Sequence, residues 1–178
     1  MKKQFLTPAI TILAAAAVLL GLSFALNGAA AERAQSEHLR LMRTVLPGSE
    51  HFTVEPYTGQ DSGILSVHKG ETGFVIQTCT PGYAADITML VGVSSEGRVT
   101  GLVVQDMAET VGLGMQALND HVFLAQLLNT AGEAEVGTNV DAITGATVTS
   151  KAVVRSVNSA IAYVTGADVE SGATSWGG

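Results

Sequence analysis

Apolar residues dominate one long stretch near the start of the chain. No charged residue lies between Lys3 and Glu32, and the 19 residues from Pro8 to Leu26 are mostly apolar. As a helix, such a segment would extend about 28 Å, which nearly spans a hydrocarbon core of roughly 30 Å. The pattern therefore predicts a transmembrane anchor within residues 1–31.

A cleavable signal peptide is the alternative interpretation of this stretch. Residues 28–31 (Gly-Ala-Ala-Ala) would offer the small residues that a cleavage site needs. The apolar core of a signal peptide is roughly 7–15 residues long, which is shorter than this one. The retained anchor is therefore favoured, and Lys2 and Lys3 orient its N-terminus toward the cytoplasm. Both interpretations place the rest of the chain outside the cytoplasmic membrane.

Beyond residue 31 the pattern becomes that of a folded domain. From Ala31 to Leu46, apolar residues recur at spacings of three and four, which predicts a helix that ends before Pro47. Short runs rich in branched and aromatic residues then predict strands, at residues 52–54, 64–67, 72–78, 87–93 and 99–104. Ser94 to Gly97 separates the last two strands and predicts a tight hairpin.

Helices return in the second half of the chain. The spacing predicts helices over residues 115–128 and 148–164, with a short extended piece over residues 136–143 between them. Because the strands cluster instead of alternating with helices, the order favours an α+β domain with an antiparallel sheet flanked by helices. We expect an anchor over residues 1–31, an exterior domain over residues 32–165 and a loose tail over residues 166–178.

Composition excludes several classes of protein. The chain has 9 basic and 16 acidic residues and a net charge of −7, so it lacks the basic surface that nucleic-acid binding requires. Cys79 is the only cysteine, which excludes an intrachain disulfide and any cysteine-based metal or iron–sulfur site within the chain. The 4 histidines are scattered without metal-ligand spacing. We therefore expect neither a metal site nor a nucleic-acid partner.

Hydroxyl residues crowd the start of the last predicted helix. They lie in Asp141 to Ser150, which contains three threonines and a serine. The simplest interpretation is helix capping, because Ser and Thr are favoured at helix N-termini. A second interpretation is an anion site, since free backbone N–H groups and the helix dipole attract phosphate there. Gly145 and Ala146 would let such a ligand approach closely, and a threonine hydroxyl could be esterified by its phosphate.

The order Asp141-x-x-Thr144-Gly145-Ala146-Thr147 resembles the D-x-x-[S/T]-G-A-[S/T] signature of domains that carry covalently bound FMN. In that family a flavin transferase joins the FMN phosphate to the last Ser or Thr of the signature. The resemblance implies that this residue is Thr147. It also implies that Asp141, Thr144, Gly145 and Ala146 contact the cofactor.

Two further segments carry the same resemblance. Gly82 to Ile87 is similar to the family's GYGGDI segment, with Ala84 and Ala85 in place of two glycines, and residues 109–114 resemble its ETPGLG loop, with Val111 in place of proline. The resemblance implies that this loop lines the flavin through Glu109, Thr110, Gly112, Leu113 and Gly114. With the anchor, the chain resembles the G subunit of the Rnf complexes, the membrane-bound ferredoxin:NAD oxidoreductases.

This resemblance implies a single-pass membrane electron carrier with covalent FMN, the other Rnf subunits as partners and a flavin transferase for maturation. No residue stands out as a general acid, base or nucleophile acting on a substrate, so we expect no complete reaction from this chain alone. Three alternatives stay open. They are the C subunit of a sodium-pumping NADH:quinone oxidoreductase, a stand-alone extracellular flavoprotein, and a non-redox anchored module in which Thr147 merely caps the last helix.

Overall fold

The computed structural model describes residues 32–107 and 121–167. The chain divides into two compact units, Met1–Arg40 and Leu41–Gly178. In the first unit, residues 32–40 are helical. Within the described residues, no helix is long and apolar enough to cross a membrane. The predicted anchor over residues 1–31 lies outside those residues.

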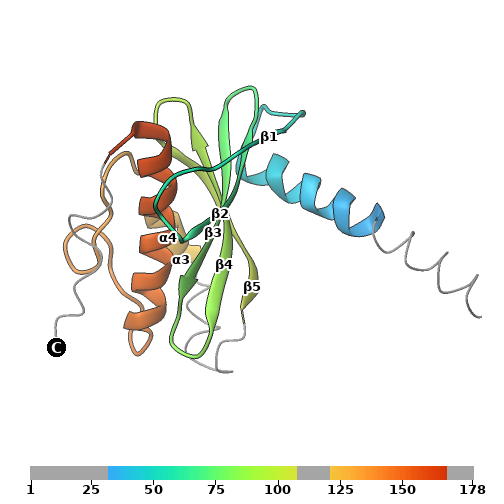
Figure 1. Ribbon diagram of the computed structural model, residues 1–178. Coiled ribbons are helices and arrows are strands. Elements are labelled where there is room, and N and C mark those ends of the chain that lie inside the picture. Colours follow the sequence, from blue (N-terminus) through green and yellow to red (C-terminus); the bar gives the residue numbers. More distant parts are fainter. Residues whose placement is uncertain (1–31, 108–120, 168–178) are drawn as a thin grey trace, which may run out of the picture. The chain divides into compact units, whose positions relative to one another are not determined.

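The second unit contains a five-stranded antiparallel sheet whose strands follow one another in chain order (Figure 1). Every strand pairs with the next one along the chain. The predicted antiparallel sheet is confirmed, and β3 and β5 each continue three residues beyond their predicted ends. The strands are β1 (Thr53–Glu55), β2 (Ile64–Lys69), β3 (Gly73–Pro81), β4 (Asp86–Ser94) and β5 (Val99–Met107).

Within the described residues 121–167, the sheet is followed by the helices α3 (His121–Leu127) and α4 (Thr147–Thr165). Helix α4 lies along one face of the sheet and packs against β3 and β4 (Figure 1). Its predicted apolar stripe is confirmed, since Val153, Val157 and Ile161 are buried in the core. The predicted helix over residues 115–128 is helical from His121 to Leu127, and residues 115–120 lie outside the described residues.

A buried hydroxyl pair sets the position of α4 along the sheet. Thr80, near the end of β3, donates its hydroxyl to the Ala152 carbonyl at 3.1 Å, and its oxygen lies 2.8 Å from the Ser156 hydroxyl. Both side chains are almost completely buried. A buried hydroxyl without a partner costs free energy, so this contact favours one position of the helix over others.

Residues 41–46 lie on the face of the sheet opposite to α4. Gly92 and Gly101 are direct neighbours on β4 and β5, and a Cβ atom on either would collide with the backbone of Val45. The missing side chains therefore leave a notch in which the chain lies directly on the sheet. Thr100 donates its hydroxyl to the Val45 carbonyl at 2.6 Å, which satisfies that backbone group.

Loops at one end of the sheet, here called the hairpin end, bind one another. The predicted β4–β5 hairpin is confirmed, with the Ser94 N–H donating to Arg98 O at 2.8 Å and Gly97 at a φ of 80°. The Ser95 N–H donates to the Thr72 carbonyl in the β2–β3 turn at 3.1 Å. A Cβ atom on Gly97 would lie 2.5 Å from Thr165 Cγ2, so the end of α4 also reaches this place.

An exposed carboxylate adds to the hairpin end. Glu71 accepts hydrogen bonds from the His51 side chain at 2.9 Å and from the backbone N–H groups of Glu50 and His51 at 3.0 and 3.2 Å. The His51 contact is the largest of several that lower the pKa of Glu71 from 4.5 to about 2. These bonds hold the segment after the first helix against the β2–β3 turn.

The extended piece predicted over residues 136–143 is wrong. The Glu135 carbonyl accepts bonds from the N–H groups of residues 138, 139 and 140, at 3.2, 3.1 and 3.1 Å. These bonds fold the segment into a turn, and only an isolated bridge joins Val136 to Val140. The physical reason is local: Asn139 accepts from the Glu135 N–H and donates to the Glu133 carbonyl, which stabilises the turn against extension.

Candidate functional site

The predicted signature, residues 141–147, lies immediately before α4 and ends on its first residue. The chain turns sharply here, because the Ala146 N–H donates to the Ile143 carbonyl at 2.9 Å. Gly145 has a φ of 81°, a backbone conformation that residues with a side chain rarely adopt. The glycine of the signature is therefore explained by the turn that leads into the helix.

Ser150 attaches this turn to the helix. Its hydroxyl is fully buried, donates to the Ala146 carbonyl at 3.0 Å and accepts from the Ile143 N–H at 3.2 Å. One side chain therefore bonds both sides of the turn that carries Gly145. The sequence placed Ser150 among the hydroxyl residues at the helix start, but did not reveal this role.

Two threonines at the start of α4, Thr147 and Thr149, differ in exposure. Thr147 is exposed to solvent, whereas Thr149 keeps only 1% of its surface accessible. Thr144 and Gly145 are exposed as well, and Ala146 is buried against the core. The fold therefore presents the hydroxyl of Thr147, the residue that the signature selects, and hides that of Thr149.

Helix capping does not explain the cluster of hydroxyl groups. The N-cap residue of α4 is Ala146, which has no side-chain capping bond, and Thr147 is already the first helical residue. The first turn also contains no acidic residue. Interpreting Thr147 as a cap is therefore wrong, and the helix starts without the side-chain acceptor that its first N–H groups usually find.

Other contacts hold the segment that precedes the signature. The Asp141 N–H donates to the side-chain carbonyl of Gln126 on α3 at 2.9 Å, while the Asp141 side chain is exposed. Further back, buried Asn158 on α4 forms a reciprocal pair with the backbone of Ala134, at 2.9 and 2.8 Å. Side chains of α3 and α4 thus hold the chain at Asp141, the first residue of the signature, and at Ala134, seven residues before it. Neither Gln126 nor Asn158 belongs to a motif, so no local sequence signal identified them.

Several segments meet at this end of the sheet, here called the signature end. Thr80 lies beside Ala152, so the last residues of β3 and the turn after them extend toward the start of α4 (Figure 1). That turn closes through the Gly82 N–H and the Ala85 carbonyl at 2.9 Å and exposes Tyr83. Ile87 pairs with Met107, so β5 also ends here. The predicted loop at residues 109–114 follows β5, but lies outside the described residues.

Comparison with known proteins adds to this geometry. A model of the FMN-binding domain family matches residues 82–162, from the β3–β4 turn into α4. The G subunit of an ion-translocating oxidoreductase complex from Methanosarcina acetivorans is 33% identical over 172 residues, which cover 87% of this chain and 90% of the relative. The corresponding protein from Escherichia coli O157:H7 is 30% identical over 190 residues, with 92% of both chains covered.

The chain belongs to the G-subunit family of ion-translocating oxidoreductase complexes. A shorter match involves the G subunit of the Na(+)-translocating ferredoxin:NAD(+) oxidoreductase complex of Acetobacterium woodii, at 35% identity over 117 residues. That match covers 61% of this chain and 54% of the relative, so the chain spans about half the length of that protein.

The signature end suits the phosphate of the FMN that this family's domain binds. An exposed hydroxyl, a helix start without a side-chain cap and a glycine turn lie within three consecutive residues, 145–147. Backbone N–H groups at a helix start are donors for anions, and the helix dipole favours negative charge there. The described part of the site thus fits the phosphate, while the predicted ring-lining residues at 109–114 stay a prediction.

Proposed function

We propose that this chain is the electron-transferring G subunit of an Rnf-type ferredoxin:NAD oxidoreductase complex, with FMN covalently attached to Thr147. The observation that carries the proposal is the exposed Thr147 hydroxyl at the uncapped start of α4, inside the family's FMN-binding domain. FMN would supply the electron-transfer chemistry, and the protein would hold and orient it. The relatives named above support the membership of such a complex.

The attachment step is a phosphoryl transfer to the threonine oxygen. Thr147 would hold the FMN through a P–O bond from its Oγ. If the donor is a flavin dinucleotide, the bond from the flavin-side phosphorus to the bridging pyrophosphate oxygen would break, a nucleoside monophosphate would leave, and the hydroxyl proton would pass to solvent or to a base of the flavin transferase. The product is a phosphodiester with one remaining negative charge, located at the positive end of α4.

Each signature residue then has a distinct task. Gly145 turns the chain and leaves room beside the phosphate, because it has no side chain. Ala146 is small and buried, and brings no capping oxygen that would compete for the helix N–H groups. Asp141 and Thr144 lie exposed on the same loop, where they can contact the flavin or its transferase. Beyond this loop, Glu109, Thr110, Gly112, Leu113 and Gly114 would line the flavin.

Residues 1–31 would anchor this domain to the cell membrane, with residues 32–165 on the exterior side. The support is the uncharged apolar segment with two preceding lysines. The other Rnf subunits would be the membrane and redox partners, and a flavin transferase would mature the chain. N-terminal sequencing of the mature protein should therefore begin at the first residues, and a start near residue 31 would reject the anchor.

Mass spectrometry of the denatured chain tests the attachment directly. The full chain is produced with and without a flavin transferase in a host that makes flavins. With the transferase, we expect an added mass of one FMN less one water, and fragmentation should assign it to Thr147. An unmodified chain under these conditions contradicts the proposal. Modification of a residue other than Thr147 would show that this other residue is the acceptor.

A further inference from the structure

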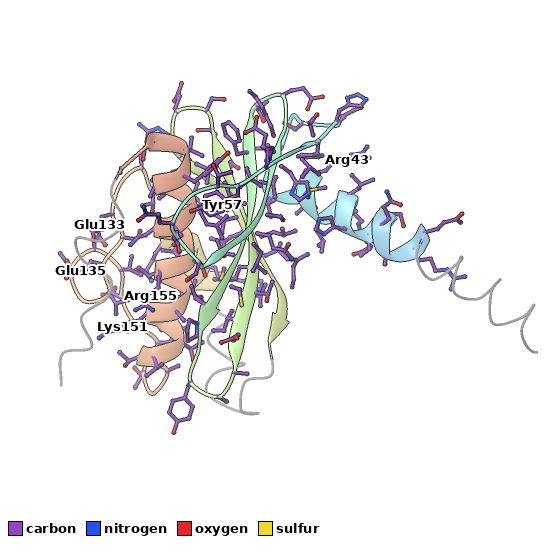
Figure 2. All side chains as sticks on the ribbon, viewed as in Figure 1. Arg43, Tyr57, Glu133, Glu135, Lys151 and Arg155 are labelled. Carbon is purple, nitrogen blue, oxygen red and sulfur yellow. The ribbon has the colours of Figure 1, made fainter. Side chains whose placement is uncertain are left out.

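Lys151 lies one helical turn after Thr147, the proposed acceptor of the flavin. It lies four residues after Thr147 in α4, which puts the two side chains on the same side of the helix, one turn apart. Both are exposed to solvent. Figure 2 shows Lys151 on the outer side of α4, away from the sheet, with Arg155 one turn further along. A lysine side chain has the length and freedom to reach a group attached to Thr147.

No carboxylate of the described residues pairs with the ammonium group of Lys151. Among the described residues it has no ion-pair partner, although the chain carries an excess of acidic groups. Other cations of the domain are engaged: Lys69 lies 3.8 Å from Glu55, and Arg98 lies 3.9 Å from Glu96. The cation nearest in sequence to the acceptor thus forms no ion pair with the described carboxylates, of which Glu133 and Glu135 lie in the loop beside α4 (Figure 2).

We propose that Lys151 forms an ion pair with the phosphodiester of FMN on Thr147 and so positions the attached flavin. This inference rests on the proposed function, because the anion exists only after attachment. The helix start and the ammonium group would then act on the phosphate together, from the end and from the side of α4. Fixing the phosphate restricts the directions in which the rest of the flavin can extend.

Thermal unfolding of loaded and unloaded chains tests this pair. The phosphodiester stays attached in the unfolded chain, so the change in melting temperature on loading reports only interactions that folding creates. We expect loading to raise the melting temperature of the parent by roughly 1–4 °C more than that of Lys151→Gln. The difference should be present at about 0.01 M salt and should largely vanish at about 1 M, where charges are screened within roughly 3 Å.

Two control variants separate a local ion pair from a general charge effect. Lys151→Arg keeps the positive charge and should retain the parental gain on loading. Arg98→Gln removes an equal charge from the hairpin end, beyond the other end of α4, and should also retain the parental gain. Phosphorus NMR gives a second measurement: the phosphodiester resonance should shift with salt in the loaded parent and much less in Lys151→Gln.

The possible outcomes separate the inference from the proposed function. If the parent acquires no FMN on Thr147, the proposed function fails before Lys151 is tested. If the parent is loaded but Lys151→Gln shows the same gain and the same salt response, the ion pair is rejected and the attachment stands. The ion pair is also rejected if Lys151→Arg behaves like Lys151→Gln, or if Arg98→Gln loses the gain equally.

Discussion

The two ends of α4 are built in opposite ways. At the C-terminal end, Gly166 adopts a left-handed conformation with a φ of 70°, and its N–H donates to the Ala162 carbonyl at 2.8 Å. The Thr165 hydroxyl donates to the Ile161 carbonyl at 2.9 Å, so side chain and backbone both close this end. At the N-terminal end, Ala146 offers no side-chain cap, and the hydroxyl of Thr147 is exposed.

This difference separates residues that complete the fold from residues that are available to a ligand. Orphan backbone groups at a helix end must find partners, and the chain itself supplies them at the hairpin end. At the signature end they remain available to water or to an anion. Substitutions at the hairpin end should therefore change stability, and substitutions at the signature end should change flavin attachment.

The largest expected effect is the loss of covalent flavin in Thr147→Ala. The substitution removes the acceptor oxygen, and because the side chain is exposed, the free energy of unfolding should change by less than about 0.5 kcal/mol. Flavin fluorescence of the denatured chain on a gel gives the measurement. Thr147→Ser should keep the flavin, as should Thr149→Ala, whose hydroxyl is buried. Covalent flavin in Thr147→Ala would show that another residue is the acceptor.

A pair of glycine substitutions compares the two ends at equal backbone strain. Gly97→Val introduces a side chain at a φ of 80°, close to Thr165, and should lower the free energy of unfolding by about 1–3 kcal/mol without changing the rate of attachment. Gly145→Val introduces the same side chain at a φ of 81° and should slow attachment as well. Urea unfolding and timed mass spectrometry measure both effects. Equal rates of attachment in the two variants would show that the two ends of α4 do not differ in their effect on flavin attachment.

Ser150→Ala should combine a loss of stability with a slower attachment. It removes the buried hydroxyl that bonds Ile143 and Ala146, at a cost of about 1–3 kcal/mol for the backbone N–H left without it. The turn that presents Thr147 loses its link to the helix. Thr165→Val removes a hydroxyl bond from the other end of α4 and serves as the control. If both variants attach flavin at the parental rate, Ser150 supports only the fold.

The smallest expected effect is the pH dependence due to Glu71. Folding lowers its pKa from 4.5 to about 2, mainly through the hydrogen bond from His51. A lowered pKa in the folded state means that the stabilisation is complete above pH 4.5 and is lost as the pH falls toward about 2. The difference in urea midpoint between the parent and Glu71→Gln should shrink over this range. A difference independent of pH would contradict the assignment.

Local signals predicted the sheet well and the loops poorly. The β4–β5 hairpin follows from branched strands on both sides of a turn that ends in Gly97, and each of these signals lies within a few residues. The segment from Val136 to Val140 contains valines that suggested extension. Its turn depends on the side chain of Asn139 and on several hydrogen bonds to the Glu135 carbonyl. The spacing of apolar residues does not predict such bonds.

The same limit applies to the site. The signature predicted Thr147 from its order alone, but nothing in that order shows that Thr149 is buried while Thr147 is exposed. Exposure depends on which side of α4 packs against β3 and β4. Ser150, Gln126 and Asn158 bond the signature and the segment before it, through partners 4 to 24 residues away that only the fold reveals.

The notch at Gly92 and Gly101 has a mechanical consequence. Residues 41–46 follow the N-terminal segment, and the backbone of Val45 lies directly on β4 and on the edge strand β5. A pull on residues 41–46 would therefore act on β4, which pairs with strands on both sides, and on β5, which pairs with β4. Such a load would reach β4 and β5 before it reached β1, the short strand at the opposite edge of the sheet. Helix α4 packs against β3 and β4 on the other face of the sheet, so such a load would not act on it directly.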